Sequence, residues 1–91
     1  MAKSLHTQEY KIFRKYLAKV RDDRGFTQTG LAEILGKPQS FVSKYESGER
    51  RLDVIEFLAV CEALKLDSSV ALKTIVNLVR NEYERSDRCG K

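Results

Sequence analysis

The segment from Gln28 to Ser47 reads QTGLAEILGKPQSFVSKYES, and its pattern decides the fold of the chain. Gly36 divides the segment into two short stretches, and each stretch carries apolar residues at helical spacing. Glycine suits the turn because it tolerates left-handed backbone, and Ala32 is small enough to stand where two helices cross closely. The residues expected to face inward are Leu31, Leu35, Val42 and Tyr45. The segment therefore predicts two short helices packed at a steep angle across a tight turn.

Three further helices are expected around this segment, and the alternating pattern of strands is absent, so the predicted fold class is all-α with five helices. The first helix begins after Thr7, and Gly25 is placed to end it. Pro38 is expected at the first position of the helix after the turn, because its missing N–H would have no partner there. Gly48 ends that helix.

The C-terminal half predicts a fourth and a fifth helix. Asp53 with Glu56 three residues later has the pattern of a capping box. The apolar residues that follow cover much of the helix circumference, so we expect this helix to be central to the core. They are Val54, Ile55, Phe57, Leu58, Val60, Cys61 and Leu64. The fifth helix is expected over residues 68–83, which closes one domain of residues 7–83 between flexible tails of residues 1–6 and 84–91.

Two apolar stripes run along the expected fifth helix. The first consists of Ala71, Ile75 and Leu78, and one stripe suffices to dock the helix on the domain. The second consists of Leu72, Val76, Val79 and Tyr83. An exposed apolar strip of that length is unusual on a monomer, so the second stripe is a candidate homodimer interface. A helix buried on both sides is the alternative.

Composition excludes several classes of protein. A chain of 91 residues accommodates one domain. Its two cysteines are isolated, so they predict neither a disulfide framework nor a zinc site, and a reducing, cytoplasmic setting fits them. No apolar run approaches the roughly 20 residues that span a bilayer, and no secretory signal is visible. No nucleophile with its base, metal cluster or phosphate-binding glycine loop is present, so we expect no enzyme and no cofactor.

Basic residues are concentrated in the first part of the chain. Residues 1–52 hold eleven Lys and Arg against six Asp and Glu, whereas residues 53–91 hold six against seven. A locally positive surface favours an anionic partner, and nucleic acid is the commonest such partner of a small basic domain. A soluble protein with a high isoelectric point is the alternative that charge alone leaves open.

The run from Phe26 to Asp67 resembles the helix-turn-helix domain of the Xre family, which includes the phage Cro proteins and repressors. The resemblance is carried by TQ at 27–28, by LA followed by LG at 31–32 and 35–36, and by YESGER at 45–50. It implies a five-helix, lambda-repressor-like domain that binds double-stranded DNA and regulates transcription. A homodimer would read an inverted repeat whose half-sites lie about 10 bp apart. The second interpretation is an antitoxin or co-regulator whose main role is to bind a protein partner.

The resemblance also implies roles for individual residues. In proteins of this type the third helix lies in the major groove, where side chains meet base edges. The base-contacting residues would be Gln39, Ser40, Ser43 and Lys44, and the phosphate-contacting residues would be Thr27, Gln28, Lys37, Arg50 and Arg51. Phe41 either packs on a neighbouring helix or contacts a thymine methyl. Arg21 and Glu46 match a pair that fixes the orientation of the third helix in this family.

Three positions depart from the family pattern. Gly30 stands where glutamate is frequent, which removes a capping partner for Thr27 and lowers helix propensity. Lys37 replaces an apolar residue of the turn, and Pro38 replaces a capping hydroxyl. These changes weaken the local helices without altering the side chains expected to face DNA.

Overall fold

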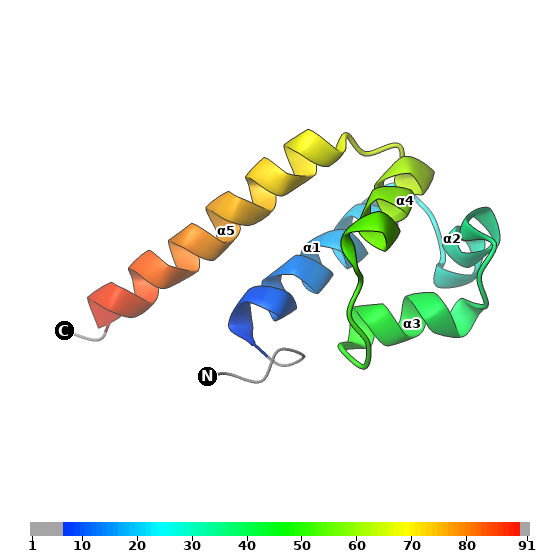
Figure 1. Ribbon diagram of the computed structural model, residues 1–91. Helices are drawn as coiled ribbons and strands as arrows, with labels where there is room; N and C mark the ends of the chain where they lie inside the picture. The colour runs from blue at the N-terminus through cyan, green and yellow to red at the C-terminus, as the bar shows by residue number, and fades with distance from the viewer. Residues whose placement is uncertain (1–6, 90–91) are drawn as a thin grey trace.

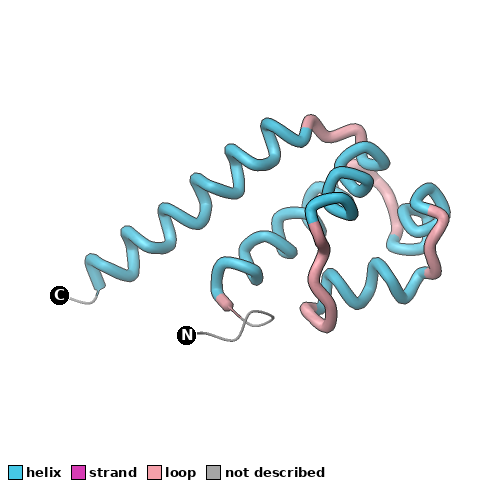
Figure 2. The backbone as a smooth tube through the Cα atoms, in the orientation of Figure 1, coloured by secondary structure: helices cyan, strands magenta, loops and turns pink. Residues whose placement is uncertain are grey.

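The computed structural model describes residues 7–89, with side chains as far as residue 84, and the described range contains helices and no strand. The predicted all-α class is confirmed. In chain order the helices are α1 (Gln8–Asp23), α2 (Gln28–Leu35), α3 (Gln39–Ser47), α4 (Val54–Leu64) and α5 (Ser68–Cys89). Figure 2 shows that short loops connect them.

The described helices form a cluster of α1 to α4 from which α5 projects. α1 packs against α3 and α5, and α4 packs against α2 and α5. Figure 1 shows α5 running back along α1 in the opposite direction and extending past the cluster, while α3 lies at the lower edge. The molecule is consequently elongated, with extents of 47 × 25 × 21 Å.

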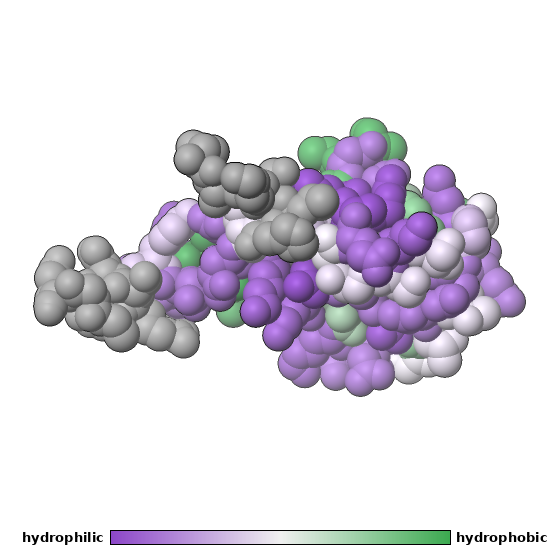
Figure 3. Space-filling model, turned by 90° about the horizontal axis from the view of Figure 1, so that it is seen from below, coloured by the Kyte–Doolittle hydropathy of each residue, from purple (hydrophilic) through white to green (hydrophobic). Residues whose placement is uncertain are grey.

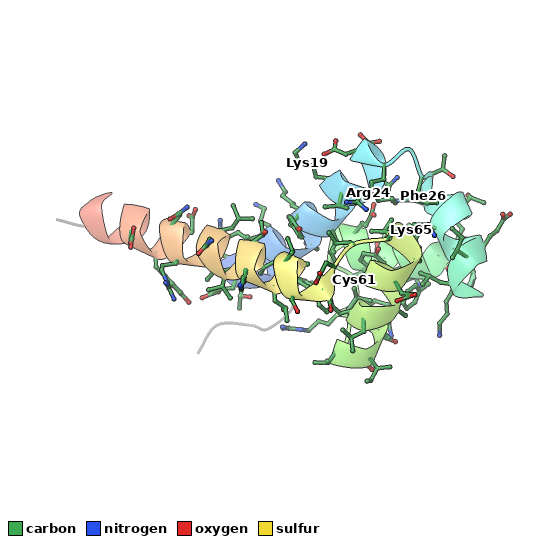
Figure 4. All side chains as sticks on the ribbon, turned by 90° about the horizontal axis from the view of Figure 1, so that it is seen from above. Lys19, Arg24, Phe26, Cys61 and Lys65 are labelled. Carbon is green, nitrogen blue, oxygen red and sulfur yellow. The ribbon has the colours of Figure 1, made fainter. Side chains whose placement is uncertain are left out.

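Local signals set most of the helix ends. The Thr7 and Thr27 hydroxyls accept hydrogen bonds from the N–H groups of Tyr10 and Gly30, at 3.2 and 2.9 Å, and so cap α1 and α2. Asp53 and Glu56 form both bonds of the capping box that begins α4. Figure 4 shows Arg24, just after α1, beside Lys65, just after α4, where the Arg24 guanidinium donates to the carbonyl oxygens of residues 64 and 65.

Pro38 is the N-cap of α3 and not its first helical residue, which corrects the expected position by one residue. Its φ of −66° and ψ of 154° are extended, and it offers no side chain that could accept a hydrogen bond. The N–H of Phe41 donates to the Pro38 carbonyl oxygen over 2.9 Å. No side-chain hydrogen bond from the N-cap therefore supports the first turn of α3.

The core lies between α1, α2, α3 and α4, with α5 sealing one side. Leu31, Val42 and Tyr45 are completely buried, and Leu35 packs at the edge of the same cluster. The other fully buried large side chains are Leu17, Leu64, Val60 and Cys61. The helix-turn-helix segment thus turns one face into the core and leaves the opposite face of α3 outside.

α4 contributes Phe57, Val60, Cys61 and Leu64 to the core, as expected, but it is buried along one face only and its other large apolar residues lie outside. Val54 and Ile55 are 71% and 72% exposed, and Leu58 is also exposed. Only α2 and α5 pack extensively against α4, and α5 leaves it at once to follow α1. No described element covers the outer side of the first turns of α4.

α5 docks through Ala71 and Ile75, and its stripe continues to Val79 rather than to the expected Leu78. Leu78 is 39% exposed, whereas Val79 packs against the core. Positions spaced by four residues follow the line of contact with α1 more closely than the alternative spacing of three. The helix also continues to Cys89, past the expected end at Tyr83, because no glycine or proline stands before Gly90. The predicted N-terminal tail and residues 90–91 lie outside the described residues.

The buried Tyr45 hydroxyl has no hydrogen-bond partner among the described residues, and burial raises the pKa of this phenol. We expect Tyr45→Phe to raise the free energy of unfolding by about 1 kcal/mol, because an unsatisfied buried hydroxyl is removed while the packing is kept. Tyr10→Phe is the matched control. Its hydroxyl donates to the Arg50 carbonyl and accepts from the Leu52 N–H, so that variant should lose stability. Urea denaturation measures both, and a destabilised Tyr45→Phe would contradict the interpretation.

Candidate nucleic-acid interface

The outer face of α3 is polar and open to solvent. Gln39, Ser40 and Lys44 are exposed, and Ser43, which is half-buried, donates to the Ser40 carbonyl over 3.3 Å. The inward positions of the same helix, Val42 and Tyr45, belong to the core. Figure 3 views the molecule from the side on which α3 lies, and hydrophilic residues cover most of this face. The four residues expected to contact bases therefore lie along one surface.

A partly buried ion pair joins the end of α1 to the end of α3. Arg21 Nε lies 2.7 Å from Glu46 Oε2, and Arg21 Nη2 lies 3.1 Å from Glu46 Oε1. The two side chains are only 14% and 8% exposed. Arg21 Nη1 also donates to the Phe26 carbonyl over 2.6 Å, and the bond to Glu46 raises the Arg21 pKa. The sequence predicts this pair, and the structure places both charges in a geometry that fixes two helices together.

Two glutamines extend this pair to the start of α3. Gln28 Nε2 donates to Glu46 Oε1 over 2.9 Å, and Gln39 Nε2 donates to Gln28 Oε1 over 2.9 Å. The chain of hydrogen bonds runs from α1 through Glu46 to the first residue of α2 and then to the first residue of α3. Sequence reasoning assigned both glutamines to DNA and missed the bond between them. The sequence did contain a signal for this bond, since an amide side chain stands at the start of each of two helices that were expected to cross.

Arg14 fixes the end of α3 from a second direction. Its Nη1 donates to the Glu46 carbonyl oxygen over 2.7 Å. Gly48 ends α3 with a φ of +90°, and a Cβ built there would lie 3.0 Å from Arg14 Nε. The glycine therefore permits both the left-handed turn and the close approach of the guanidinium. Sequence reasoning missed Arg14, which stands two helical turns before Arg21 on the same side of α1.

The basic residues beyond the ends of α3 lie against aromatic rings. Lys37 Nζ and Arg50 Cζ lie 5.3 and 4.8 Å from the centroid of the Phe41 ring. Arg51 Cζ lies 4.5 Å from the Tyr10 ring centroid. Phe41 is half-buried and meets the Tyr45 ring edge-on, with centroids 5.7 Å apart. Because Tyr45 belongs to the same helix, this contact decides neither of the two interpretations of Phe41.

Arg50 is also held by the first turn of α4. Its Nη1 and Nη2 lie 3.1 and 3.2 Å from the two carboxylate oxygens of Glu56. Glu56 accepts in addition from the Asp53 N–H over 3.0 Å. The hydrogen bonds from Arg50 and from the Asp53 backbone lower the pKa of Glu56 below its ordinary value. The bonds to Glu56 thus restrict the position of the Arg50 guanidinium at the edge of the α3 face.

The residues predicted to form a dimer interface do not share one environment. Leu72, Val76 and Tyr83 are about half exposed, while Val79 is shared with the core. A groove of about 310 Å³ on this side of α5 is lined by Ile75, Val76, Val79, Arg80 and Tyr83. The Tyr83 hydroxyl also donates to the Glu9 carboxylate. Sequence reasoning missed the second apolar surface, which is formed by Val54, Ile55 and Leu58 of α4.

No group of three or more His, Cys, Asp or Glu side chains in the described part of the chain could hold a metal ion. Among the described helices, none is long and apolar enough to cross a membrane.

Comparison with known proteins shows which family and which solved structures this chain resembles. The sequence profile of the helix-turn-helix family matches residues 17–70. An Xre-family-like protein from Pseudomonas syringae pv. tomato str. DC3000 is 41% identical, with a TM-score of 0.76 over 82% of this chain and 92% of that chain. The wild-type restriction-modification controller protein C.Esp1396I is 18% identical, with a TM-score of 0.75 over 81% of this chain and 97% of that chain.

The same controller protein has also been solved as a tetramer in complex with its natural 35 base-pair operator. That structure gives a TM-score of 0.73 at 18% identity, over 79% of this chain and 95% of that chain. At this identity the likeness to the controller protein shows a shared fold. None of the curated proteins matches the sequence.

The lowered pKa of Glu56 predicts an acid-dependent loss of stability. The ionised carboxylate contributes stability that is fully present above its ordinary pKa of 4.5 and is lost as the pH falls through the lower folded value. We expect Glu56→Gln to lower the free energy of unfolding at neutral pH by about 0.5 kcal/mol and to weaken this acid dependence. Urea denaturation at pH values above and below the ordinary pKa measures the free energy of unfolding of each protein. Glu62→Gln, on the exposed side of α4, should follow the wild type, and an equal acid dependence in all three proteins would contradict the role of Glu56.

Proposed function

The chain belongs to the Xre family of helix-turn-helix DNA-binding regulators, and from this premise we propose that it reads an operator with α3 in the major groove, as a homodimer. The observation that carries the proposal is the exposed polar face of α3, which the partly buried Arg21–Glu46 pair holds in one orientation. A helix that presents hydrogen-bonding side chains on a rigid support is what base recognition requires.

The side chains along α3 match the chemistry of base edges. The Gln39 amide offers a donor and an acceptor in the plane that adenine presents, and the Lys44 ammonium can donate to guanine O6 and N7. Ser40 and Ser43 suit several bases. Gln39 is held by Gln28 before DNA arrives, so the cost of ordering its side chain is lower than for a free glutamine.

The phosphate contacts would flank α3 at both ends. Thr27 and Gln28 stand at the start of α2, whose first amide groups and positive dipole end favour an anion. Lys37 precedes α3, and Arg50 and Arg51 follow it. Contacts of this kind set the register of a protein on the duplex without reading its sequence. Arg51, held against Tyr10, and Arg50, held against Phe41, support this assignment because their positions are already restricted.

The homodimer would form through the exposed stripe of α5. Leu72, Val76 and Tyr83 supply an apolar surface, Val79 closes it toward the core, and the groove beside them can receive side chains from a second copy. Two copies with α3 helices about 34 Å apart would read an inverted repeat with half-sites about 10 bp apart.

A protein partner is the second candidate occupant of the α5 groove. The observation that favours it is the projection of α5 beyond the other described helices, where a partner could reach it without touching α3. In that case the chain would act as an antitoxin or co-regulator with its DNA-binding face still available.

Base reading by α3 predicts a loss of specificity in a double variant. Gln39→Ala combined with Lys44→Ala should reduce the preference for a selected duplex over a scrambled one by about 100-fold or more, because each such contact contributes about 1–3 kcal/mol of discrimination. Weak, salt-sensitive binding should remain. Competition titrations measure the preference, and Lys73→Ala on α5 controls for the lost charge. Unchanged discrimination in the double variant would refute the assignment.

The dimer proposal predicts that Val76→Glu produces monomers, since a carboxylate in an apolar interface cannot be solvated or paired. Sedimentation velocity at micromolar concentration measures the oligomeric state. Asn77→Glu is the control, because residue 77 adds the same charge on the exposed side of α5 away from the stripe. A wild-type protein that is monomeric under these conditions would show that the dimer surface is misplaced.

A further inference from the structure

We propose that Phe41 is a positioning residue whose ring holds Lys37 and Arg50 together as a binding site for a backbone phosphate of duplex DNA. The proposal rests on the DNA-binding function proposed above and assigns Phe41 a part in it. The two cations are thirteen positions apart in the sequence and come from opposite ends of α3. One aromatic ring in the first turn of α3 brings them onto the same patch of surface.

The geometry around the ring supports this role. Both cations lie within 5.3 Å of the Phe41 centroid, a distance at which the electron-rich face of a phenyl ring attracts positive charge. Tyr45 meets the ring edge-on and fixes its orientation from the core side. The Glu56 carboxylate already faces both cations, because it accepts hydrogen bonds from Arg50 and because the charge of Lys37 also lowers its pKa. An anion that approaches the exposed side of the two cations is still attracted by both of them. A phosphodiester oxygen is the anion that the neighbouring α3 face would bring there.

Arg50 is prepared for a phosphate by its other contacts. Glu56 accepts one N–H from each terminal nitrogen, which leaves further guanidinium N–H groups for another acceptor. The Arg50 carbonyl oxygen accepts from the Tyr10 hydroxyl, so its backbone is fixed as well. The side chain nevertheless remains 37% exposed. An arginine restrained in this way loses little further freedom when it binds.

This assignment separates Phe41 from the residues that read bases. A ring occupied by two cations acts on any duplex, because phosphates are the same at every position. A ring that contacts a thymine methyl would act only on duplexes that carry thymine at that site. The two roles therefore predict different effects on affinity, on salt dependence and on sequence preference.

The test compares Phe41→Leu, which keeps an apolar side chain without a π face, with Phe41→Tyr, which keeps the ring. The probes are a duplex selected from random DNA by the wild-type protein and a scrambled duplex of equal length, titrated over a range of salt concentrations. Phe41→Leu should weaken both duplexes by about 10-fold. It should also reduce the slope of log K against log salt by about one, the amount for one lost phosphate contact. The preference between duplexes should not change, and Phe41→Tyr should behave like the wild type.

Phe13→Leu serves as the matched control. Phe13 packs against the rings of Tyr10 and Phe57 in tilted arrangements, so its loss should lower thermal stability without changing the salt slope of the folded protein. Lys37→Gln and Arg50→Gln test the site without touching the ring, and each should lower the salt slope by about one. If Phe41→Leu fails to fold, these two variants still test the proposal, because unchanged salt slopes in both of them would overturn it.

Each remaining outcome has a defined meaning. If Phe41→Leu weakens only the selected duplex and the slope is unchanged, the ring reads a base and the proposal is overturned. Unchanged binding at every salt concentration, or unchanged slopes in both cation variants, overturns it too. If the wild type binds the selected and the scrambled duplex equally well, operator reading is refuted. The phosphate site still stands in that case, provided that Phe41→Leu lowers the slope of log K against log salt.

Discussion

The partly buried ion pair between Arg21 and Glu46 is the interaction on which the arrangement of the domain depends. The Glu46 carboxylate accepts hydrogen bonds from Arg21 and Gln28, and its backbone carbonyl accepts one from Arg14. One residue of α3 is therefore bonded to both α1 and α2. Removing two charges from water costs about as much as their attraction returns, so such a pair contributes little net stability. Its contribution is orientation, because an unpaired charge at this depth would be strongly unfavourable in any other position of α3.

Side chains at the α3 face are held before any ligand is present. The chain of bonds from Glu46 through Gln28 restrains Gln39 at one end, and aromatic rings restrain Lys37, Arg50 and Arg51 beyond both ends. Such restraint lowers the entropy lost on binding, which is the main gain from preorganisation. The basic excess of residues 1–52 therefore has a structural counterpart, since the cations that flank α3 all belong to that part of the chain.

Apolar exposure is concentrated in the C-terminal half of the chain. The outer sides of α4 and α5 present Val54, Ile55, Leu72 and Val76 to solvent. In the described residues the polar face of α3 and these apolar faces belong to different elements. A surface for an anion and a surface for an apolar partner can thus act without competing, and a mutation in one need not disturb the other.

The sequence by itself determined most of the helix caps and turns, because a cap or a positive-φ glycine depends on residues within one helical turn. It misplaced the start of α3 by one residue and the end of α5, and the Arg21–Glu46 pair came from the family resemblance. Only the tertiary structure decided that Val79 and not Leu78 continues the docking stripe, and that Val54 and Ile55 of α4 lie outside. Helical periodicity allowed two apolar stripes to be drawn on α5. The apolar pattern of α4 does not say which of its residues another helix will cover. The bonds of Gln28 to Gln39, of Arg14 to the end of α3, and the two cations on Phe41 join residues distant in sequence, so they exist only once the helices have packed.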